Sequence, residues 1–126
     1  MDGREKIIYP ELSYALTGLC FKTQNIVGRF GRERQYCDVF ERQLQENDLY
    51  YEREKEIPMI RDFSNKADFV IENKVLMEMK AEPFITKNDY MQTKRYLQAS
   101  GLKLGLIVNF RSRFLKPKRV INSEAR

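Results

Sequence analysis

The sequence predicts a single α/β domain in which helices flank a mixed central sheet. The chain has 126 residues, which is enough for one compact domain and too few for two. Its elements are expected in the order helix, helix, three strands, helix, strand and a short last strand, an order typical of one α/β domain. The whole chain, 1–126, is assigned to this domain, with flexible ends expected at 1–8 and 123–126.

Two helices are expected in the first part of the chain. Apolar residues at helical spacing predict a helix over 11–28, and a glycine-containing turn separates it from a second helix over 32–47. Cys20 and Cys37 lie in the apolar stripes of these helices, and neither belongs to a CxxC or zinc-type spacing. We therefore expect both cysteines to be buried free thiols in a reducing cytoplasm.

Three strands should follow the helices. Residues 49–57 begin with β-prone side chains and then alternate in charge, which predicts an exposed or edge strand that could pair between two chains of a homodimer. A loop is expected at 62–66. The stretch 67–81 is then predicted to form a hairpin of two largely apolar strands joined by a polar turn.

The last third of the chain returns to a helix and ends in strands. Thr86 is a plausible cap for a helix over 87–100, and Gly101 suits the position just after its end. Residues 102–110 form a nearly continuous apolar run of the length of a buried strand. A short strand is expected at 118–121.

The length of the hairpin turn decides where the polar side chains point. A two-residue turn would pair Phe69 with Glu78, whereas a three-residue turn at 72–74 would pair Asp68 with Glu78. Only the three-residue turn leaves one face wholly apolar, and a buried face fixes register strongly. That apolar face would consist of Ala67, Phe69, Ile71, Val75, Met77 and Met79.

The opposite face of the same hairpin would gather three charges. Asp68, Glu78 and Lys80 would lie there beside Val70 and Leu76. Carboxylates on opposite residues of paired strands repel unless a cation intervenes. Lys80 supplies one positive charge, so the group is either a three-member salt bridge or part of a divalent metal site. Because the chain has no histidine, any metal would need oxygen ligands, which favours magnesium, manganese or calcium.

Side chains on two helices could join this group. Glu33 begins the apolar stripe of the second helix. Its carboxylate either faces the sheet or is simply a first-turn acidic residue that the helix dipole stabilises. Gln92 and Tyr96 are four residues apart and share a helix face. They are either a functional pair or a surface glutamine beside a core tyrosine.

The ordered set of these residues resembles a known family. Asp68 followed by Glu78-Met79-Lys80 resembles the D…ExK signature of the PD-(D/E)XK nuclease superfamily, and Gln92-x-x-x-Tyr96 resembles its QxxxY element. The stretch Glu33 to Tyr36 is similar to the ExxY of the GxxExxY protein family, a branch of small prokaryotic proteins. The resemblance covers roughly residues 9 to 122. It departs from the family at Phe30, where the family glycine would fall, and at Ala67, which replaces a proline.

This resemblance implies a restriction-endonuclease-like αβββαβ core and metal-dependent hydrolysis of nucleic-acid phosphodiesters, with DNA a better candidate than RNA. Mg²⁺ (or Mn²⁺) would be the cofactor, and Lys80 would orient water or stabilise charge. The implied catalytic residues are Asp68, Glu78, Lys80 and Glu33. The implied metal ligands are Asp68, Glu78, Glu33 and the carbonyl of Met79. The implied substrate-positioning residues are Gln92, Tyr96 and Tyr36.

The charge distribution suits a polyanionic partner. Residues 87–126 hold ten Lys or Arg against two acidic residues, so this segment could follow a phosphate backbone. The nucleic-acid contacts are expected at Arg111, Arg113, Lys116, Lys118 and Arg119 along one edge of a cleft. Phe110 and Phe114 either stack on bases or pack into the rim of the core.

Two alternatives to a nuclease use the same fold. The chain could be a nucleic-acid-binding module without turnover, or a partner protein whose basic segment binds an acidic protein. No stretch of the sequence approaches the roughly 20 apolar residues of a membrane span, and the first residues lack the apolar run of a secretory signal. A membrane partner is therefore not expected.

Overall fold

A computed structural model describes residues 8–57 and 66–125 of the chain. Its helices are α1 (Pro10–Val27), α2 (Glu33–Glu46) and α3 (Lys87–Ser100), and its strands are β1 (Tyr51–Glu56), β2 (Lys66–Ile71), β3 (Val75–Lys80), β4 (Leu104–Asn109) and β5 (Lys118–Ile121). These elements confirm the predicted α/β fold with its mixed sheet. Residues 62–65 of the predicted loop and most of the predicted flexible N-terminus lie outside the described residues, whereas Lys66, predicted to end the loop, begins β2.

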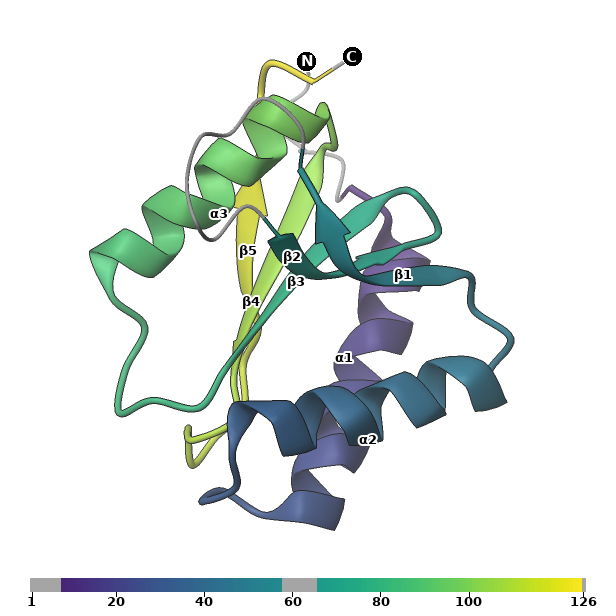
Figure 1. Cartoon of the computed structure of the whole chain (residues 1–126), viewed down its shortest axis with the longest axis vertical. Coiled ribbons are helices and arrows are strands. Elements are labelled where there is room, and N and C mark those ends of the chain that lie inside the picture. Colours follow the sequence, from purple (N-terminus) through teal and green to yellow (C-terminus); the bar gives the residue numbers. More distant parts are fainter. Residues whose placement is uncertain (1–7, 58–65, 126) are drawn as a thin grey trace.

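The five strands form one sheet in the order β1-β2-β3-β4-β5. β3 and β4 are parallel and are connected through α3, while the other neighbours are antiparallel. β1 lies at the edge of the sheet, as its alternating charges predicted; pairing between two chains at this edge stays a prediction. Figure 1 shows α3 on one side of the sheet and α1 with α2 on the other.

Two apolar clusters hold the helices to the sheet. The larger cluster joins α1 and α2 to one face of the sheet, with Phe40 and Phe69 in edge-to-face contact at a centroid distance of 5.3 Å. The smaller cluster packs Tyr96 and Leu97 of α3 against the other face. Both cysteines are buried free thiols, as predicted. In the part of the chain that the structure describes, no helix is long and apolar enough to cross a membrane.

The hairpin has the predicted three-residue turn. Ile71 pairs with Val75 and Phe69 with Met77, so the turn consists of residues 72–74. Glu72 and Asn73 both adopt positive φ, at 54° each, and the Lys74 N–H closes the turn on the Ile71 carbonyl at 2.9 Å. The paired residues end at Phe69 and Met77, and Asp68 and Glu78 are the next residues beyond this last pair on the two strands.

One member of the predicted apolar face lies on the other side of the sheet. Ala67 packs with Ile57, Val70 and Leu76 in the cluster under α3, whereas Phe69 packs under α1 and α2. The alternation changes where the ladder is interrupted, because the β2–β3 pairs begin only at Phe69. On the other flank, Glu54 lies opposite this point and adopts a φ of 53°. A residue at positive φ within a strand bends and twists it locally.

Candidate active site

The side chains of Asp68 and Glu78 take the place of backbone hydrogen bonds where the β2–β3 pairing ends. The Asp68 N–H donates to Glu78 Oε2 at 3.0 Å, and the Met79 N–H donates to Asp68 Oδ2 at 2.7 Å. Each side chain therefore bonds the backbone of the opposite strand, where a regular sheet would have backbone–backbone bonds. The carboxylates of Asp68 and Glu78 are held side by side in the opening.

The protein environment disfavours charge on both of these carboxylates. Glu78 is only 4% exposed, and burial together with repulsion from Asp68 raises its pKa well above the usual range. Burial also raises the pKa of Asp68, although the Met79 N–H and Lys80 oppose this shift. Without a cation, the pair is therefore expected to retain a proton at pH values where exposed carboxyl groups are ionised.

Lys80 lies at the end of β3, and its positive charge acts on both carboxylates. Burial lowers its pKa, but the carboxylates around it, with Glu78 and Asp89 the strongest, outweigh burial and leave the pKa raised. Its Nζ lies 3.6 Å from Asp89 Oδ1. Lys80 is therefore a positive charge at neutral pH and unsuited to act as a general base.

Two acidic residues at this end of the sheet were missed by the sequence analysis. Asp89 is fixed at the start of α3 by a capping box, in which its N–H donates to Thr86 Oγ1 and its carboxylate accepts from the Thr86 N–H. Burial and the adjacent Asp89 raise the pKa of Glu82 to about 7. The Thr-x-x-Asp spacing was a readable signal, since it predicts an Asp oriented at a helix start.

Glu33 lies across a groove from Asp68. The groove has a volume of about 680 Å³ and is lined by both residues together with Cys37 and Arg53. Partial desolvation and the charge of Asp68 raise the pKa of Glu33. Glu33 does not complete a three-carboxylate cluster, because within residues 8–57 and 66–125 no three Cys, Asp or Glu side chains are placed to hold a metal ion. Direct and water-mediated contact of Glu33 with a metal ion both stay predictions.

The donor set nevertheless suits a hard divalent cation. Asp68 and Glu78 offer adjacent carboxylate oxygens whose repulsion a cation would relieve. Magnesium is commonly bound by one or two carboxylates, with waters and substrate phosphates completing its shell. A two-carboxylate site therefore meets this requirement without a third acidic ligand.

The predicted positioning residues differ in accessibility. Gln92 Nε2 lies 3.1 Å from the Tyr96 hydroxyl, so the two residues do form a pair on one face of α3. Tyr36 is fully buried and stacks on Phe110 at a centroid distance of 4.4 Å. Its hydroxyl donates to the Gly28 carbonyl and accepts from the Gly31 N–H. Tyr36 thus supports the loop before Glu33 from inside, so direct substrate contact is incompatible with its burial.

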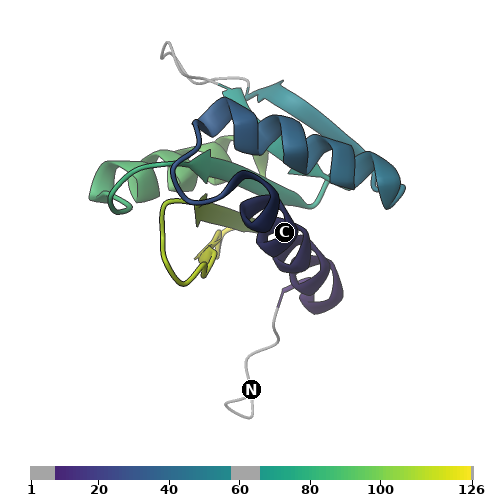
Figure 2. The same ribbon diagram turned by 90° about the horizontal axis from the view of Figure 1, so that it is seen from below.

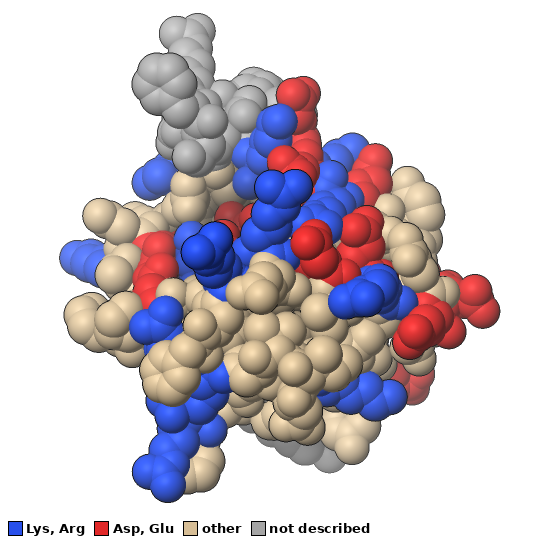
Figure 3. All heavy atoms as spheres, turned by 60° about the horizontal axis from the view of Figure 1, so that its bottom comes forward, with Lys and Arg blue, Asp and Glu red and all other residues tan. Residues whose placement is uncertain are grey.

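The predicted basic edge is divided between different parts of the surface. Lys118 lies over the Tyr90 ring on the α3 side, whereas Arg119 bonds Ser13 Oγ and the Ile8 carbonyl on the α1 side. Neighbouring residues of a strand point to opposite faces, so a single strip through both is wrong. Figure 3 shows Lys and Arg side chains interspersed with Asp and Glu over the upper part of the face it displays, and a separate group of Lys and Arg at its lower left.

Three of the predicted basic residues remain at or beyond the end of β4. Arg111 and Arg113 occupy the β4–β5 connection, and Lys116 is exposed further along it. Of the two phenylalanines there, Phe110 is buried in the core and Phe114 is exposed. The first therefore packs in the core, and the second stays available for stacking.

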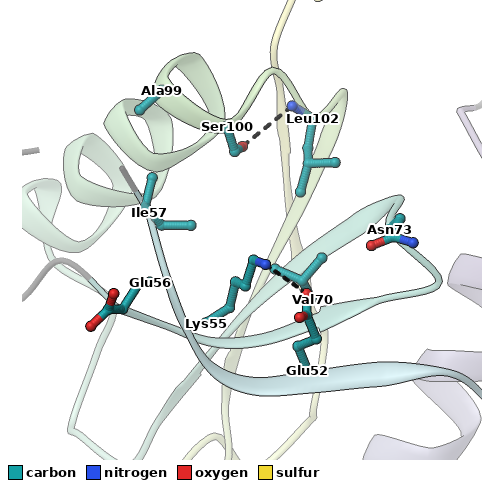
Figure 4. Close-up of a pocket in the computed structure, with 9 residues that line it drawn as sticks. All are labelled: Glu52, Lys55, Glu56, Ile57, Val70, Asn73, Ala99, Ser100 and Leu102. Carbon is teal, nitrogen blue, oxygen red and sulfur yellow. Dashed lines mark hydrogen bonds and ion pairs between the residues drawn. The ribbon is translucent and has the colours of Figure 1, made fainter. Parts of the chain in front are cut away.

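A second hollow, of about 600 Å³, lies between the β1–β2 ribbon and the end of α3 (Figure 4). Its wall includes Ile57, Val70 and Leu102, and the Lys55–Glu52 ion pair at 2.8 Å lies beside them. None of the predicted catalytic residues lines it. The candidate site therefore stays at the opening between β2 and β3.

The repulsion between the paired carboxylates predicts a stability effect. Because the folded-state pKa of Glu78 is raised, the metal-free protein loses stability as pH rises above the unfolded pKa of about 4.3. Glu78→Gln mimics the protonated form, so in EDTA at pH 7.5 the variant should unfold at a higher urea concentration than the parent protein. The gain should shrink at pH 5. A variant less stable than the parent at both pH values would contradict this assignment.

Comparison with known families agrees with this geometry. The family model of the PD-(D/E)XK nuclease superfamily matches residues 10–121, a range that contains Asp68, Glu78 and Lys80. No curated protein and no solved structure matches the chain. The closer assignment to the GxxExxY branch therefore stays a prediction.

Proposed function

The chain belongs to the PD-(D/E)XK nuclease superfamily, and on that premise we propose that it hydrolyses nucleic-acid phosphodiester bonds, with DNA as substrate, at the Asp68–Glu78 pair. The observation that carries this proposal is the opening of the sheet at the two carboxylates, with Lys80 beside them. A purely structural ion pair would not require two adjacent carboxylates with raised pKa values.

We propose Mg²⁺ or Mn²⁺ as the cofactor, held by Asp68, Glu78 and the Met79 carbonyl, with Glu33 contributing directly or through water. When bound, such an ion neutralises phosphate charge and acidifies water. A bound divalent ion would favour the ionised forms of Asp68 and Glu78, whose pKa values are raised in its absence. The affinity for the metal should therefore rise with pH.

Lys80 would stabilise the negative charge that develops on the phosphate or orient the attacking water. Its ammonium is held by Asp89 and stays protonated at neutral pH, so it can donate hydrogen bonds but is poorly suited to accept a proton. Gln92 would help to position the substrate from α3. The burial of Tyr96 and Tyr36 supports the view that both tyrosines act by holding their elements in place.

A cleavage panel tests the proposal. Labelled single- and double-stranded DNA and RNA are incubated with the protein in Mg²⁺, Mn²⁺ or EDTA, alongside the Lys80→Ala variant. We expect metal-dependent cleavage that EDTA abolishes and that the variant lacks, with DNA cleaved faster than RNA. Salt-sensitive binding without cleavage in any metal would instead support the non-catalytic module.

A further inference from the structure

Phe30 is an exposed aromatic residue in the loop that connects α1 and α2, and the guanidinium groups of two arginines lie near its ring. Phe30 is 77% exposed. The guanidinium carbon of Arg29 lies 5.2 Å from its ring centroid, and that of Arg111 lies 5.5 Å away. An aromatic face flanked by guanidinium groups is the composition with which proteins stack nucleobases and hold the adjoining phosphates.

Backbone contacts hold both arginines in place. Arg29 Nε donates to the Arg111 carbonyl at 3.0 Å, and Arg111 Nη2 donates to the Ala81 carbonyl at 3.2 Å. Ala81 directly follows Lys80 in the chain. The Phe30 platform is therefore tied to the end of β3 where the proposed chemistry occurs, and less side-chain freedom is lost on binding.

Two further phenylalanines are exposed on neighbouring loops. Phe84 is 70% exposed in the β3–α3 connection, and Phe114 is 83% exposed in the β4–β5 connection with Arg113 over its ring at 5.6 Å. Figures 1 and 2 show these two connections and the α1–α2 loop at the same end of the sheet. Single exposed apolar residues are ordinary, but three aromatic rings with three arginines at one end are not explained by packing.

We propose that Phe30, Arg29 and Arg111 bind an unpaired nucleotide, and that the substrate of the proposed nuclease is single-stranded nucleic acid or a single-stranded end. The assignment as substrate rests on the proposed function. The base would stack on the Phe30 ring while the guanidinium groups contact its phosphates. In a duplex the base faces are covered by their neighbours, so this ring can engage only an unstacked base.

A tryptophan at the platform gives a direct readout, because the chain contains none. Phe30→Trp is prepared in an Asp68→Asn background in EDTA, so that binding is measured without cleavage, and is titrated with a 20-nucleotide oligothymidylate. Stacking should quench the single tryptophan in a saturable manner. The matched control is Tyr14→Trp, at an 83% exposed position on α1, where no quenching is expected.

Alanine variants measure the contribution of the ring. In the same background, Phe30→Ala should weaken oligothymidylate binding about 5- to 100-fold and change duplex binding less than about two-fold, whereas Tyr14→Ala should change neither. No quenching at Phe30→Trp, or equal losses for single strand and duplex, would overturn the proposal. Cleavage of duplex DNA without quenching would sink this inference alone, whereas quenching without cleavage in any metal would sink only the proposed nuclease activity.

Discussion

Asp68→Asn should abolish metal-dependent cleavage, lowering the rate by about 1,000-fold or more, which corresponds to roughly 4 kcal/mol of barrier. The amide removes one of two charged oxygen ligands, while it can still accept the Met79 N–H bond that Asp68 makes at 2.7 Å. The fold should therefore persist while metal binding is lost. Initial cleavage rates on the best substrate of the panel, together with circular dichroism, measure the two effects.

The matched control for this variant is Asp48→Asn. Asp48 is exposed in the turn after α2 and adopts a φ of 53°, a conformation that asparagine also tolerates. It should retain parental activity. Mg²⁺ should raise the melting temperature of the parent and of the control but not of Asp68→Asn, because only a folded state that binds the ion is stabilised by it. An Asp68→Asn protein that still cleaves at a parental rate would refute the assignment.

Lys80→Ala should lower the cleavage rate by about 100- to 1,000-fold. This is the effect expected when one hydrogen-bond donor to the charge that develops on the phosphate is removed. Unlike Asp68→Asn, it should keep the thermal shift with Mg²⁺, because no metal ligand is removed. Lys80→Arg should retain more activity than Lys80→Ala, since a guanidinium replaces the positive charge but cannot act as a base. Single-turnover rates and thermal shifts separate these effects.

Lys22→Ala on the exposed side of α1 is the matched control for removal of a lysine. It should change neither the rate nor the thermal shift. If Lys80→Arg were as inactive as Lys80→Ala while it bound Mg²⁺ normally, a general-base role for Lys80 would fit better than charge stabilisation. A loss of the Mg²⁺ shift in Lys80→Ala would show that Lys80 organises the carboxylates.

The hairpin was predictable because one buried face constrains every side chain in it. Only a three-residue turn makes that face apolar, and the pairing of Ile71 with Val75 confirms it. The same parity rule failed at Ala67, because it assumes an unbroken ladder. The ladder ends where the side chains of Asp68 and Glu78 accept hydrogen bonds from backbone N–H groups. The local sequence pattern does not predict that interruption.

The position of α3 next to the site also could not be predicted from the spacing of residues along the sequence. A Thr-x-x-Asp cap predicts how Asp89 is oriented on its own helix, but its 3.6 Å contact with Lys80 depends on how the helix packs on the sheet. The placement of Lys118 and Arg119 on opposite faces could, in contrast, have been predicted from the sequence. Neighbouring side chains of a strand alternate between its two faces. The prediction of one basic edge counted the charges and did not take this alternation into account.

The most direct test of the account is anomalous scattering from crystals grown with Mn²⁺. A single manganese peak is predicted between the carboxylates of Asp68 and Glu78, with oxygen atoms of both at about 2.1 Å, and it should vanish in Asp68→Asn crystals. A protein that cleaves nucleic acid in Mn²⁺ but carries its manganese elsewhere, with none between these two carboxylates, would contradict the account.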